Sequence, residues 1–202
     1  LVSKPGETCF QPQVSPDGKS IAYLKDRTAI AVMDIESGKE KIVLDKSVNY
    51  SYSDGDQSFA WSPDSRYILC NYQANGGWNN EDIALIDLES GEITDLTESG
   101  YTDSAFRWAL KGKAMTWATD RDGYRSHGSW GAEDDIYIMF FDGQRYMEFN
   151  RDKEDRAIAD MQKSDKEKAK EEKKEKKDSI KAEKKAERLI LDLENRKDRT
   201  VR

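Results

Sequence analysis

The chain is poor in the residues that most catalytic and metal-binding sites use. Among 202 residues it has one histidine, His127, and two cysteines, Cys9 and Cys70. With one imidazole, any Ser-His-Asp triad or histidine-based metal site would depend on His127 alone. The cysteines form neither a metal-ligand nor a redox spacing, and Cys70 lies within an apolar run, where we expect a small buried residue. The sequence therefore predicts no cofactor and no bound metal ion.

Long apolar runs are also missing. No stretch of about 18 apolar residues is present, and no charged segment is followed by an apolar run and a small-residue cleavage site. We therefore expect no membrane span. The chain begins with Leu1 and not with Met, which favours a piece of a longer polypeptide, so the missing leader has no bearing on location.

The charge is unevenly distributed. Charged residues make up 36% of the chain, and residues 151–188 hold 15 Lys/Arg and 12 Asp/Glu. The rest of the chain then has 18 basic and 28 acidic residues, a formal charge of −10. Because an acidic body repels phosphate backbones, we expect no nucleic-acid partner unless the basic-leaning segment acts alone.

A corner motif repeats along the chain. The stretch SPDG at 15–18 is followed 47 residues later by SPDS at 62–65. A third copy is degenerate but keeps the same spacing, because FRWALKGK at 106–113 overlays FAWSPDSR at 59–66. Proline fixes the backbone at the first corner position and aspartate can bond the amides that follow, so each copy predicts a turn between two strands.

Each corner is followed by a second shared pattern. AIAVMDIESGKEKIVL at 29–44 matches IALIDLESGEITDLT at 83–97: an apolar strand ending in Asp, a Glu-Ser-Gly turn, and an alternating strand. Gly38 and Gly91 stand where a tight hairpin needs a positive φ. Each repeat thus predicts four short antiparallel strands. For the second repeat they are expected at about 57–61, 66–72, 82–87 and 92–97.

Four-stranded units of this length indicate β-propeller blades. We predict an all-β fold, a partial propeller of three four-stranded antiparallel blades at about 8–47, 55–100 and 102–142, within residues 1–150. Val14, Trp61 and Trp108 occupy equivalent places in the first strands and are expected at the packing interfaces between blades. A sandwich of hairpins is the alternative. Three blades cannot close a ring, so we expect further blades in the parent protein or association of copies into a homo-oligomer.

The third repeat contains an insertion. Its last strand is expected within 191–202, where RKDRTVR parallels GEITDLT, and residues 151–190 precede it. This segment lacks Pro and Gly and is rich in Lys, Glu and Ala, so it is predicted to be helical or disordered. It is either a solvated helix or charged loop, or a docking arm for another domain or subunit.

Two motifs resemble active-site or metal-site signatures but depart from them. HGSWG at 127–131 has His127 where a nucleophile elbow needs glycine, so Ser129 is not predicted to be catalytic, and we predict no catalytic residue in this chain. DRDG at 120–123 begins like a calcium loop, but its twelfth position is glycine and not glutamate. Calcium binding through Asp120, Asp122, Asp134 and Asp135 remains a weaker alternative to a polar turn.

Two longer loops carry aromatic residues. Residues 73–82 and 120–135 follow the second strands of their repeats and are expected on one face of the propeller, opposite the corners and the insertion. Exposed aromatic side chains there are candidate recognition groups for a peptide. The candidate substrate-binding residues are Trp78, Tyr124, His127 and Trp130. Alternatively, these side chains fold back and cap the blades.

The repeats resemble a known group of blades. SPDGKSIAYL followed by IAVMDIESGKEKIVL, and WSPDSRYILCNY followed by DIALIDLESGEITDLT, are similar to TolB-like propeller blades. Such blades also occur in tricorn-type proteases and in prolyl oligopeptidase and dipeptidyl aminopeptidase relatives. WATDRDGYRSHGSWGAEDDIYIMFFD at 117–142, the charged insertion and LILDLENRKDRTVR narrow the resemblance to the N-terminal propeller of bacterial tricorn-like serine proteases. The sequence ALKG at 109–112 departs from the SPDG pattern.

The resemblance implies a function. It implies an exported, periplasmic or cell-envelope protein of bacteria, in which the propeller guides or gates peptides or unfolded polypeptide to a serine-protease domain outside this chain. The remaining domains of the same parent protein would then be partners. A TolB-like envelope binding module without enzyme activity is one alternative, and the propeller of a prolyl oligopeptidase relative is another. A PDZ-like segment with a later catalytic serine, no enzyme domain, or a Gly-x-Ser-x-Gly elbow downstream would distinguish the three.

Overall fold

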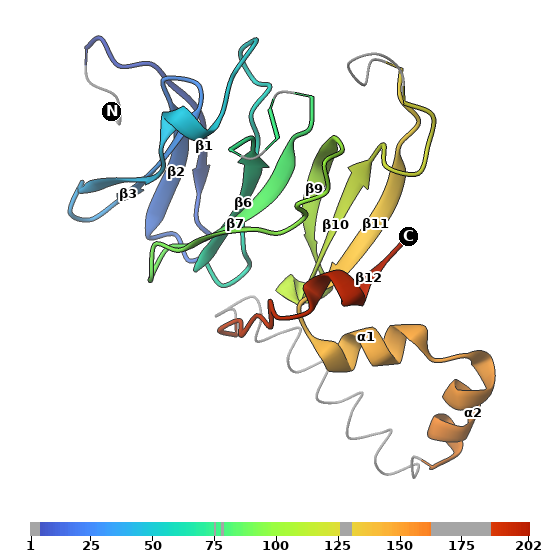
Figure 1. The fold of residues 1–202 in the computed structure, drawn as a ribbon. Helices are drawn as coiled ribbons and strands as arrows, with labels where there is room; N and C mark the ends of the chain where they lie inside the picture. Colours follow the sequence, from blue (N-terminus) through green and yellow to red (C-terminus); the bar gives the residue numbers. More distant parts are fainter. Residues whose placement is uncertain (1–4, 75, 78, 126–130, 163–186) are drawn as a thin grey trace.

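The computed structural model shows three four-stranded antiparallel sheets standing side by side (Figure 1). It describes residues 5–74, 76–77, 79–125, 131–162 and 187–202. In each sheet the strands are arranged in chain order, so that every strand pairs with its sequence neighbour. This is a partial β-propeller of three blades, as the repeats predict.

The blades have the following strands. Blade 1 comprises β1 (Cys9–Val14), β2 (Ser20–Lys25), β3 (Ala29–Asp34) and β4 (Glu40–Leu44). Blade 2 comprises β5 (Phe59–Trp61), β6 (Tyr67–Tyr72), β7 (Asp82–Asp87) and β8 (Ile93–Asp95). Blade 3 comprises β9 (Asp103–Ala109), β10 (Ala114–Thr119), β11 (Asp135–Phe140) and β12 (Thr200–Val201). The strands of blade 2 fall within one or two residues of those predicted from the repeat.

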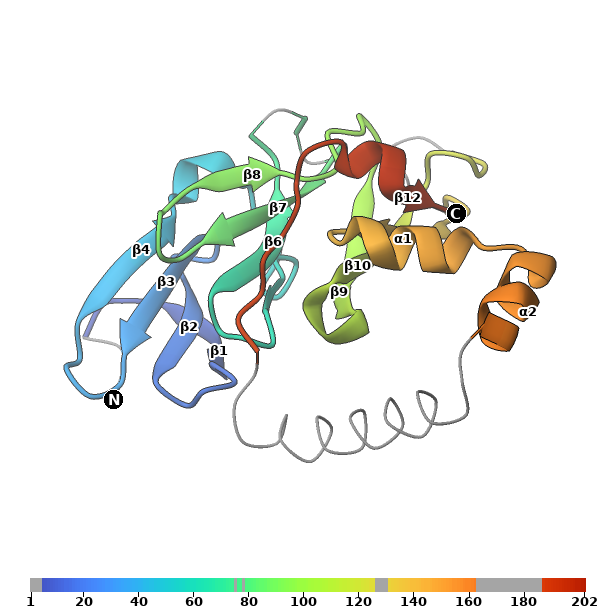
Figure 2. The same ribbon diagram turned by 90° about the horizontal axis from the view of Figure 1, so that it is seen from below.

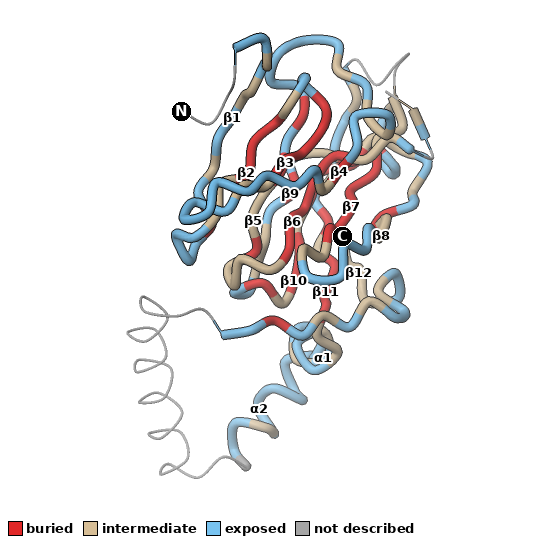
Figure 3. The backbone as a smooth tube through the Cα atoms, turned by 90° about the vertical axis from the view of Figure 1, so that its left-hand side faces the viewer, coloured by how far each residue is buried: buried red, intermediate tan, exposed pale blue. Residues whose placement is uncertain are grey.

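Apolar side chains fill the two spaces between the blades. The buried residues lie along the inner strands of the sheets (Figure 3, red). Successive residues of a strand point to opposite faces of the sheet. Each inner strand of blade 2 therefore packs against blade 1 with one set of side chains and against blade 3 with the other. Ile68 and Cys70 of β6 pack toward blade 1, and Leu69 between them packs toward blade 3. The predicted burial of Cys70 is confirmed, since it is fully buried. The alternation of apolar residues therefore positions three sheets face to face.

The Ser-Pro-Asp corners have the same geometry in blades 1 and 2. Ser15 Oγ donates to Asp17 Oδ1 at 2.6 Å, and the amide of Lys19 donates to the same oxygen at 3.1 Å. In blade 2, Ser62 Oγ donates to Asp64 Oδ1 at 2.6 Å, and the amide of Arg66 donates to it at 3.2 Å. The serine and aspartate thus satisfy the backbone groups of a tight turn. This explains why the corner recurs in the sequence.

The prediction for the first-strand residues is confirmed at two of three positions. Trp61 packs against the core between blades 1 and 2, and Trp108 packs against the core between blades 2 and 3. Val14, in contrast, is 60% exposed. It pairs with Ile21 on the face of blade 1 that points away from blade 2, and the described part of the chain places no sheet against that face. The interface prediction is therefore wrong for Val14.

Two helices among the described residues follow β11, before the chain returns to form β12 of blade 3 (Figure 2). Helix α1 (Gly143–Asn150) begins directly after β11, because Asp142 Oδ1 accepts bonds from the amides of Gln144 and Arg145. Tyr146 and Phe149 of α1 contact the ring of Phe140. Helix α2 (Lys153–Gln162) follows, and the remainder of the predicted insertion up to residue 186 lies outside the described residues. Helical structure thus starts at 143, earlier than the 151 expected.

Residues 187–195, which we name the return segment, bring the chain back across blade 2 (Figure 2). Leu189 is buried in the core between blades 2 and 3, and its amide donates to Asp64 Oδ2 at 2.8 Å. A 3-10 turn (Arg196–Arg199) then leads into β12, which pairs with β11 over two residues. The last strand is consequently much shorter than the predicted range 191–202.

Candidate functional site

The loops divide between the two ends of the sheets. The links between blades and the loops after the second strands contact one another at one end, which we name the loop face. Thr102 Oγ1, in the link to blade 3, donates to the carbonyl oxygen of Asn79 at 2.8 Å, and Arg125 Nη2 donates to the same oxygen at 2.7 Å. The Ser-Pro-Asp corners and the return segment lie at the other end, the corner face. The blades thus place the predicted recognition loops together.

Exposed aromatic side chains occur on the loop face. Tyr124, a predicted recognition residue, is 67% exposed. Trp78, His127 and Trp130, the other three candidates, and Ser129 lie outside the described residues. Sequence reasoning missed Tyr50 and Tyr52, which are 61% and 87% exposed in the link between blades 1 and 2. The polar Asn-Tyr-Ser-Tyr-Ser stretch at 49–53 could have indicated these two tyrosines, because aromatic residues with only polar neighbours are expected to be exposed.

Hydrogen bonds hold the backbone of this link. Gln73 Oε1 accepts from the amide of Tyr50 at 2.8 Å, and Gln57 Nε2 donates to the carbonyl oxygen of Tyr50 at 3.1 Å. Asp56 Oδ2 accepts from the amide of Ser53 at 2.8 Å, and Asp56 Oδ1 accepts from the hydroxyl of Ser51 at 2.8 Å. The tyrosine side chains are therefore exposed on a fixed backbone, which lowers the entropy cost of binding through them.

Glu81 anchors the network beneath the link. Its Oε2 accepts from Gln73 Nε2 at 2.7 Å, and Asn71 Nδ2 donates to the same carboxylate. Burial raises the pKa of Glu81 to about 7, although the two amide donors oppose this shift, and the charges of Asp56 and Asp103 add to it. Through Gln73, the carboxylate of Glu81 is connected to the backbone of Tyr50.

The acidic residues between blades 2 and 3 have protein partners. Asp82 Oδ1 accepts from the amide of Ser99 at 2.8 Å and from Thr97 Oγ1 at 3.0 Å. Asp103 accepts from Trp117 Nε1 at 3.1 Å and from Ser99 Oγ at 2.7 Å. Burial raises the pKa of Asp82, and the nearby Asp103 raises it further, while these hydrogen bonds lower it. These carboxylates have structural roles between the blades.

Three of the four possible calcium ligands are directed to different partners. Asp120 is fully buried as a side chain, pairs with Arg125 Nε at 3.0 Å and accepts from the amide of Thr102 at 3.0 Å. Asp122 accepts a hydrogen bond from the hydroxyl of Tyr137, and Asp135 pairs with Arg202 at 3.0 Å. Within residues 5–74, 76–77, 79–125, 131–162 and 187–202, no three His, Cys, Asp or Glu side chains gather in a metal-binding group.

Two buried side-chain polar atoms have no hydrogen-bond partner in the described part of the chain: Gln57 Oε1 and Thr119 Oγ1. Gln57 belongs to the link that carries Tyr50. Thr119 is the last residue of β10 and pairs with Asp103 of β9. A buried water molecule at either position would supply the missing hydrogen bond to that atom.

Two hollows lie on the described part of the chain, one between blades 2 and 3 and one between blade 2 and the return segment. One, of about 260 Å³, has Trp117 and Met139 among its lining residues, together with Arg121 and Lys197. Lys197 Nζ is paired with Glu98 at 2.6 Å, while Arg121 lies over the ring of Tyr137 at 5.5 Å from its centre.

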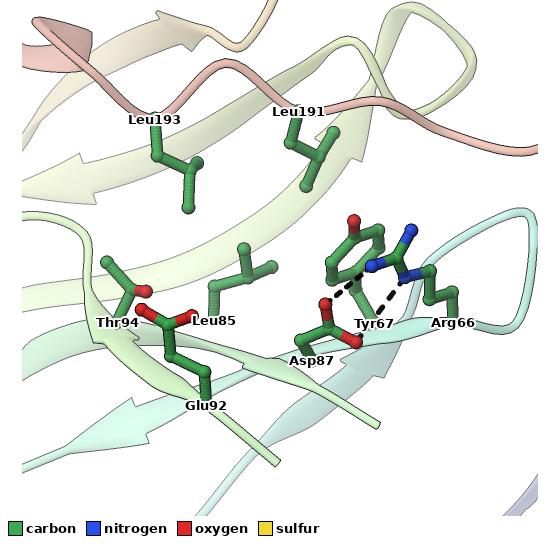
Figure 4. Close-up of a pocket in the computed structure, with 8 residues that line it drawn as sticks. All are labelled: Arg66, Tyr67, Leu85, Asp87, Glu92, Thr94, Leu191 and Leu193. Atoms are coloured by element: carbon green, nitrogen blue, oxygen red, sulfur yellow. Dashed lines mark hydrogen bonds and ion pairs between the residues drawn. The ribbon is translucent and has the colours of Figure 1, made fainter. Parts of the chain in front are cut away.

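The other hollow, of about 230 Å³, lies between the return segment and blade 2 (Figure 4). Leu191 and Leu193 point from the return segment toward Leu85 and Tyr67 of the sheet. Asp87, Arg66, Glu92 and Thr94 complete the lining. We name this hollow the Glu92 slot.

No helix among the residues the structure describes has the length and apolarity needed to cross a bilayer. No family model matches the sequence. No curated protein matches it either.

Solved structures do match the fold. TolB from Acinetobacter baumannii is 25% identical with a TM-score of 0.51, over 69% of this chain and 31% of TolB. The tricorn protease is 19% identical with a TM-score of 0.53, over 70% of this chain and 14% of the protease. The chain thus spans a third or less of the length of either protein. With the repeated corners and the row of sheets, these matches show that the chain has the fold of three TolB-like β-propeller blades, a fold that it shares with the tricorn protease.

Proposed function

We propose that this chain is the non-catalytic propeller part of an exported tricorn-like serine protease, periplasmic or in the cell envelope, and that it guides peptides or unfolded polypeptide to a catalytic domain outside the chain. The observation that carries this proposal is the presentation of Tyr50 and Tyr52 on a hydrogen-bonded link at the loop face, with Tyr124 exposed at the same end. The fold shared with the tricorn protease supports it.

Tyrosines in such positions suit polypeptide recognition. An exposed phenol ring offers apolar area and one hydroxyl while losing only two side-chain torsions on binding, so it contributes to contact with many sequences. The hydrogen bonds from Gln57 and Gln73 fix the link before a ligand arrives. A guiding surface needs broad and weak recognition of this kind, since tight binding would retain the peptide.

The test is binding of a permanently unfolded polypeptide by the parent protein. The triple substitution Tyr50→Ser, Tyr52→Ser and Tyr124→Ser should weaken binding of a reduced and carboxymethylated protein by about tenfold, because the principal aromatic contacts are lost. Ile190→Ser is the matched control, since Ile190 is 90% exposed on the corner face. Equal binding by the triple variant and this control would disprove the recognition role of the tyrosines.

The same experiment covers the residues that the structure does not describe. Trp78→Ala and Trp130→Ala should each reduce binding or processing of peptides by the parent protein. Unchanged binding and processing in both variants would remove these two residues from the proposed surface, and the assignment would then depend on Tyr50, Tyr52 and Tyr124.

A TolB-like envelope module without enzyme activity is the second candidate. It is favoured by the identity to TolB, 25%, against 19% to the tricorn protease. The two functions differ in one measurement on the parent protein. Cleavage of the bound polypeptide, abolished by a serine-directed inhibitor, supports the protease, whereas binding without cleavage supports the docking module. Cell fractionation that recovers the protein in the cytoplasm would contradict both.

A further inference from the structure

The Glu92 slot differs in chemistry from the loop face. Its walls are aliphatic and aromatic, from Leu85 and Tyr67 on the sheet and Leu191 and Leu193 on the return segment (Figure 4). Its volume of about 230 Å³ is below the roughly 300–1,000 Å³ of sites for small-molecule ligands. The slot therefore suits one extended side chain and not a whole cofactor.

The charges at the slot are only partly paired. Arg66 Nη2 lies 2.7 Å from Asp87 Oδ2, and Arg66 Nε lies 3.3 Å from Glu89 Oε2. Arg188 also pairs with Glu89, at 2.7 Å. Two cations thus face three carboxylates when Glu92 is included, and the carboxylate of Glu92 has no hydrogen bond or ion pair within the described part of the chain. Glu92 therefore lacks a direct ion-pair partner among the described residues.

Arg66 is fixed in its place. Its guanidinium lies 4.8 Å from the centre of the Tyr67 ring and donates to Asp87 through both Nε and Nη2. Although burial raises the pKa of Asp87, bonds from Arg66 and from the amides of Glu89 and Ser90 lower it below its ordinary value. Asp87 and Arg66 therefore neutralise each other in a two-bond ion pair. Glu92 is the carboxylate of the slot that remains able to interact with a ligand.

We propose that the Glu92 slot binds a lysine or arginine side chain of an extended polypeptide. The aliphatic stem of such a side chain lies along Leu85, Leu191 and Leu193, and its charged head reaches the carboxylate of Glu92. Lysine and arginine combine an apolar stem with a terminal cation in this way. A purely aliphatic side chain would desolvate Glu92 without pairing it, and an acidic one would be repelled by Asp87 and Glu92.

This site is separate from the proposed function. The Glu92 slot lies toward the corner face, next to the Ser-Pro-Asp corner of blade 2, whereas Tyr50, Tyr52 and Tyr124 lie at the other end of the blades. Loss of binding at the tyrosines leaves the slot intact, and loss of Glu92 leaves the tyrosines intact. The two proposals therefore fail independently.

The test uses three capped heptapeptides of alanine that differ at the central residue, which is lysine, norleucine or glutamate. Binding to the protein with labelled leucine methyl groups is followed by NMR. The lysine peptide should shift the methyl signals of Leu85, Leu191 and Leu193, and its affinity should fall as salt is added. The norleucine peptide, which keeps an aliphatic stem without the charge, should bind more weakly by up to about fivefold, because an exposed ion pair contributes at most about 1 kcal/mol.

Substitution of the carboxylate completes the test. Glu92→Gln should weaken the lysine peptide about fivefold, whereas Glu36→Gln, the same change on the equivalent hairpin of blade 1, should have no effect. Glu36 and Glu92 are both exposed, so both variants are expected to fold. Equal affinity of the lysine and norleucine peptides, equal effects of the two substitutions, or no shift at the three leucines would each overturn the proposal.

Discussion

The indole Nε1 of Trp108 donates a hydrogen bond of 3.2 Å to the carbonyl oxygen of Ala60 in the neighbouring blade. The same bond is present 47 residues earlier, where Trp61 Nε1 donates to the carbonyl oxygen of Gln13 at 3.2 Å. One side chain thus fills the space between two sheets and also satisfies a backbone oxygen of the preceding first strand. The bond recurs with the period of the sequence, so the two described interfaces between blades share the same contact.

This relationship predicts a difference between tryptophans and the equivalent valine. Trp108→Phe should lower the free energy of unfolding by about 1 kcal/mol, and Trp61→Phe by a similar amount, because each leaves a carbonyl oxygen without its donor. Trp108→Ala should cost about 3 kcal/mol through lost packing. Urea denaturation followed by circular dichroism measures these changes.

Val14→Ala is the control for this series. Val14 occupies the equivalent position in blade 1 but is 60% exposed, so its truncation should change stability by less than about 0.5 kcal/mol. A Val14→Ala variant as unstable as Trp108→Ala would contradict the assignment of Trp61 and Trp108 as inter-blade residues.

The sequence was sufficient for the blades because the information that specifies them is local. The backbone and side-chain bonds of Ser62, Pro63 and Asp64 specify a corner without help from distant residues. The alternation along Ile68, Leu69 and Cys70 shows which face of the sheet each side chain occupies. The period of 47 residues then identifies equivalent positions without any coordinates. Val14 was misassigned since the pattern gives the face on which a residue lies but not whether a neighbour covers that face.

The return segment could not be predicted in this way. Leu189 alternates with Leu191 and Leu193, a pattern that predicts a strand, but these residues form no strand and instead cross blade 2, with Leu189 buried between blades 2 and 3. Its burial depends on contacts with Asp64 and Gly112, which are 125 and 77 residues away in the sequence. The start of α1, in contrast, did have a local signal, the capping residue Asp142.

Glu81 makes stability dependent on pH. Burial raises its pKa in the folded chain from 4.5 to about 7, so between these values the folded protein holds a proton that the unfolded chain releases. Stability should consequently fall as the pH rises from about 5 to about 8, by about 2 kcal/mol. Thermal or urea unfolding across this range, with Glu81→Gln as the reference, isolates the contribution of this one carboxyl.

The difference in unfolding free energy between the wild type and Glu81→Gln is the quantity to examine, because other titrating groups cancel in it. The unfolding free energy of the wild type should fall relative to that of Glu81→Gln as the pH rises. A difference that stays constant from pH 5 to pH 8 would show that Glu81 titrates in the same way in both states.

The corner aspartates should differ in their effect on the return segment. Asp64→Ala and Asp17→Ala each remove the bonds to the corner serine and to the following turn, but only Asp64 also accepts from the amide of Leu189, at 2.8 Å. Asp64→Ala should cost about 1 kcal/mol more than Asp17→Ala. Hydrogen exchange should show faster exchange at residues 187–195 in Asp64→Ala alone. Equal exchange there in both variants would mean that Asp64 does not anchor the segment.

Gly112, in the degenerate corner of blade 3, should be sensitive to an added methyl group. A Cβ at this position would lie 2.5 Å from Leu189 Cδ1 and 3.2 Å from Pro63 Cδ, and the backbone has a φ of +92°. Gly18, in the corner of blade 1, has a similar φ of +73° but nothing within 4 Å of the added atom. Gly112→Ala and Gly18→Ala share the cost of a left-handed conformation, about 1 kcal/mol. Only Gly112→Ala should add about 1 to 2 kcal/mol for displacing Leu189.

The double variant separates crowding from backbone strain. Leu189→Ala removes the two methyl groups that Gly112→Ala would meet, so the two substitutions should not be additive. The double variant should be more stable than the sum of the single effects by about 1 kcal/mol. Strict additivity would mean that the cost of Gly112→Ala comes from the backbone alone and not from contact with Leu189.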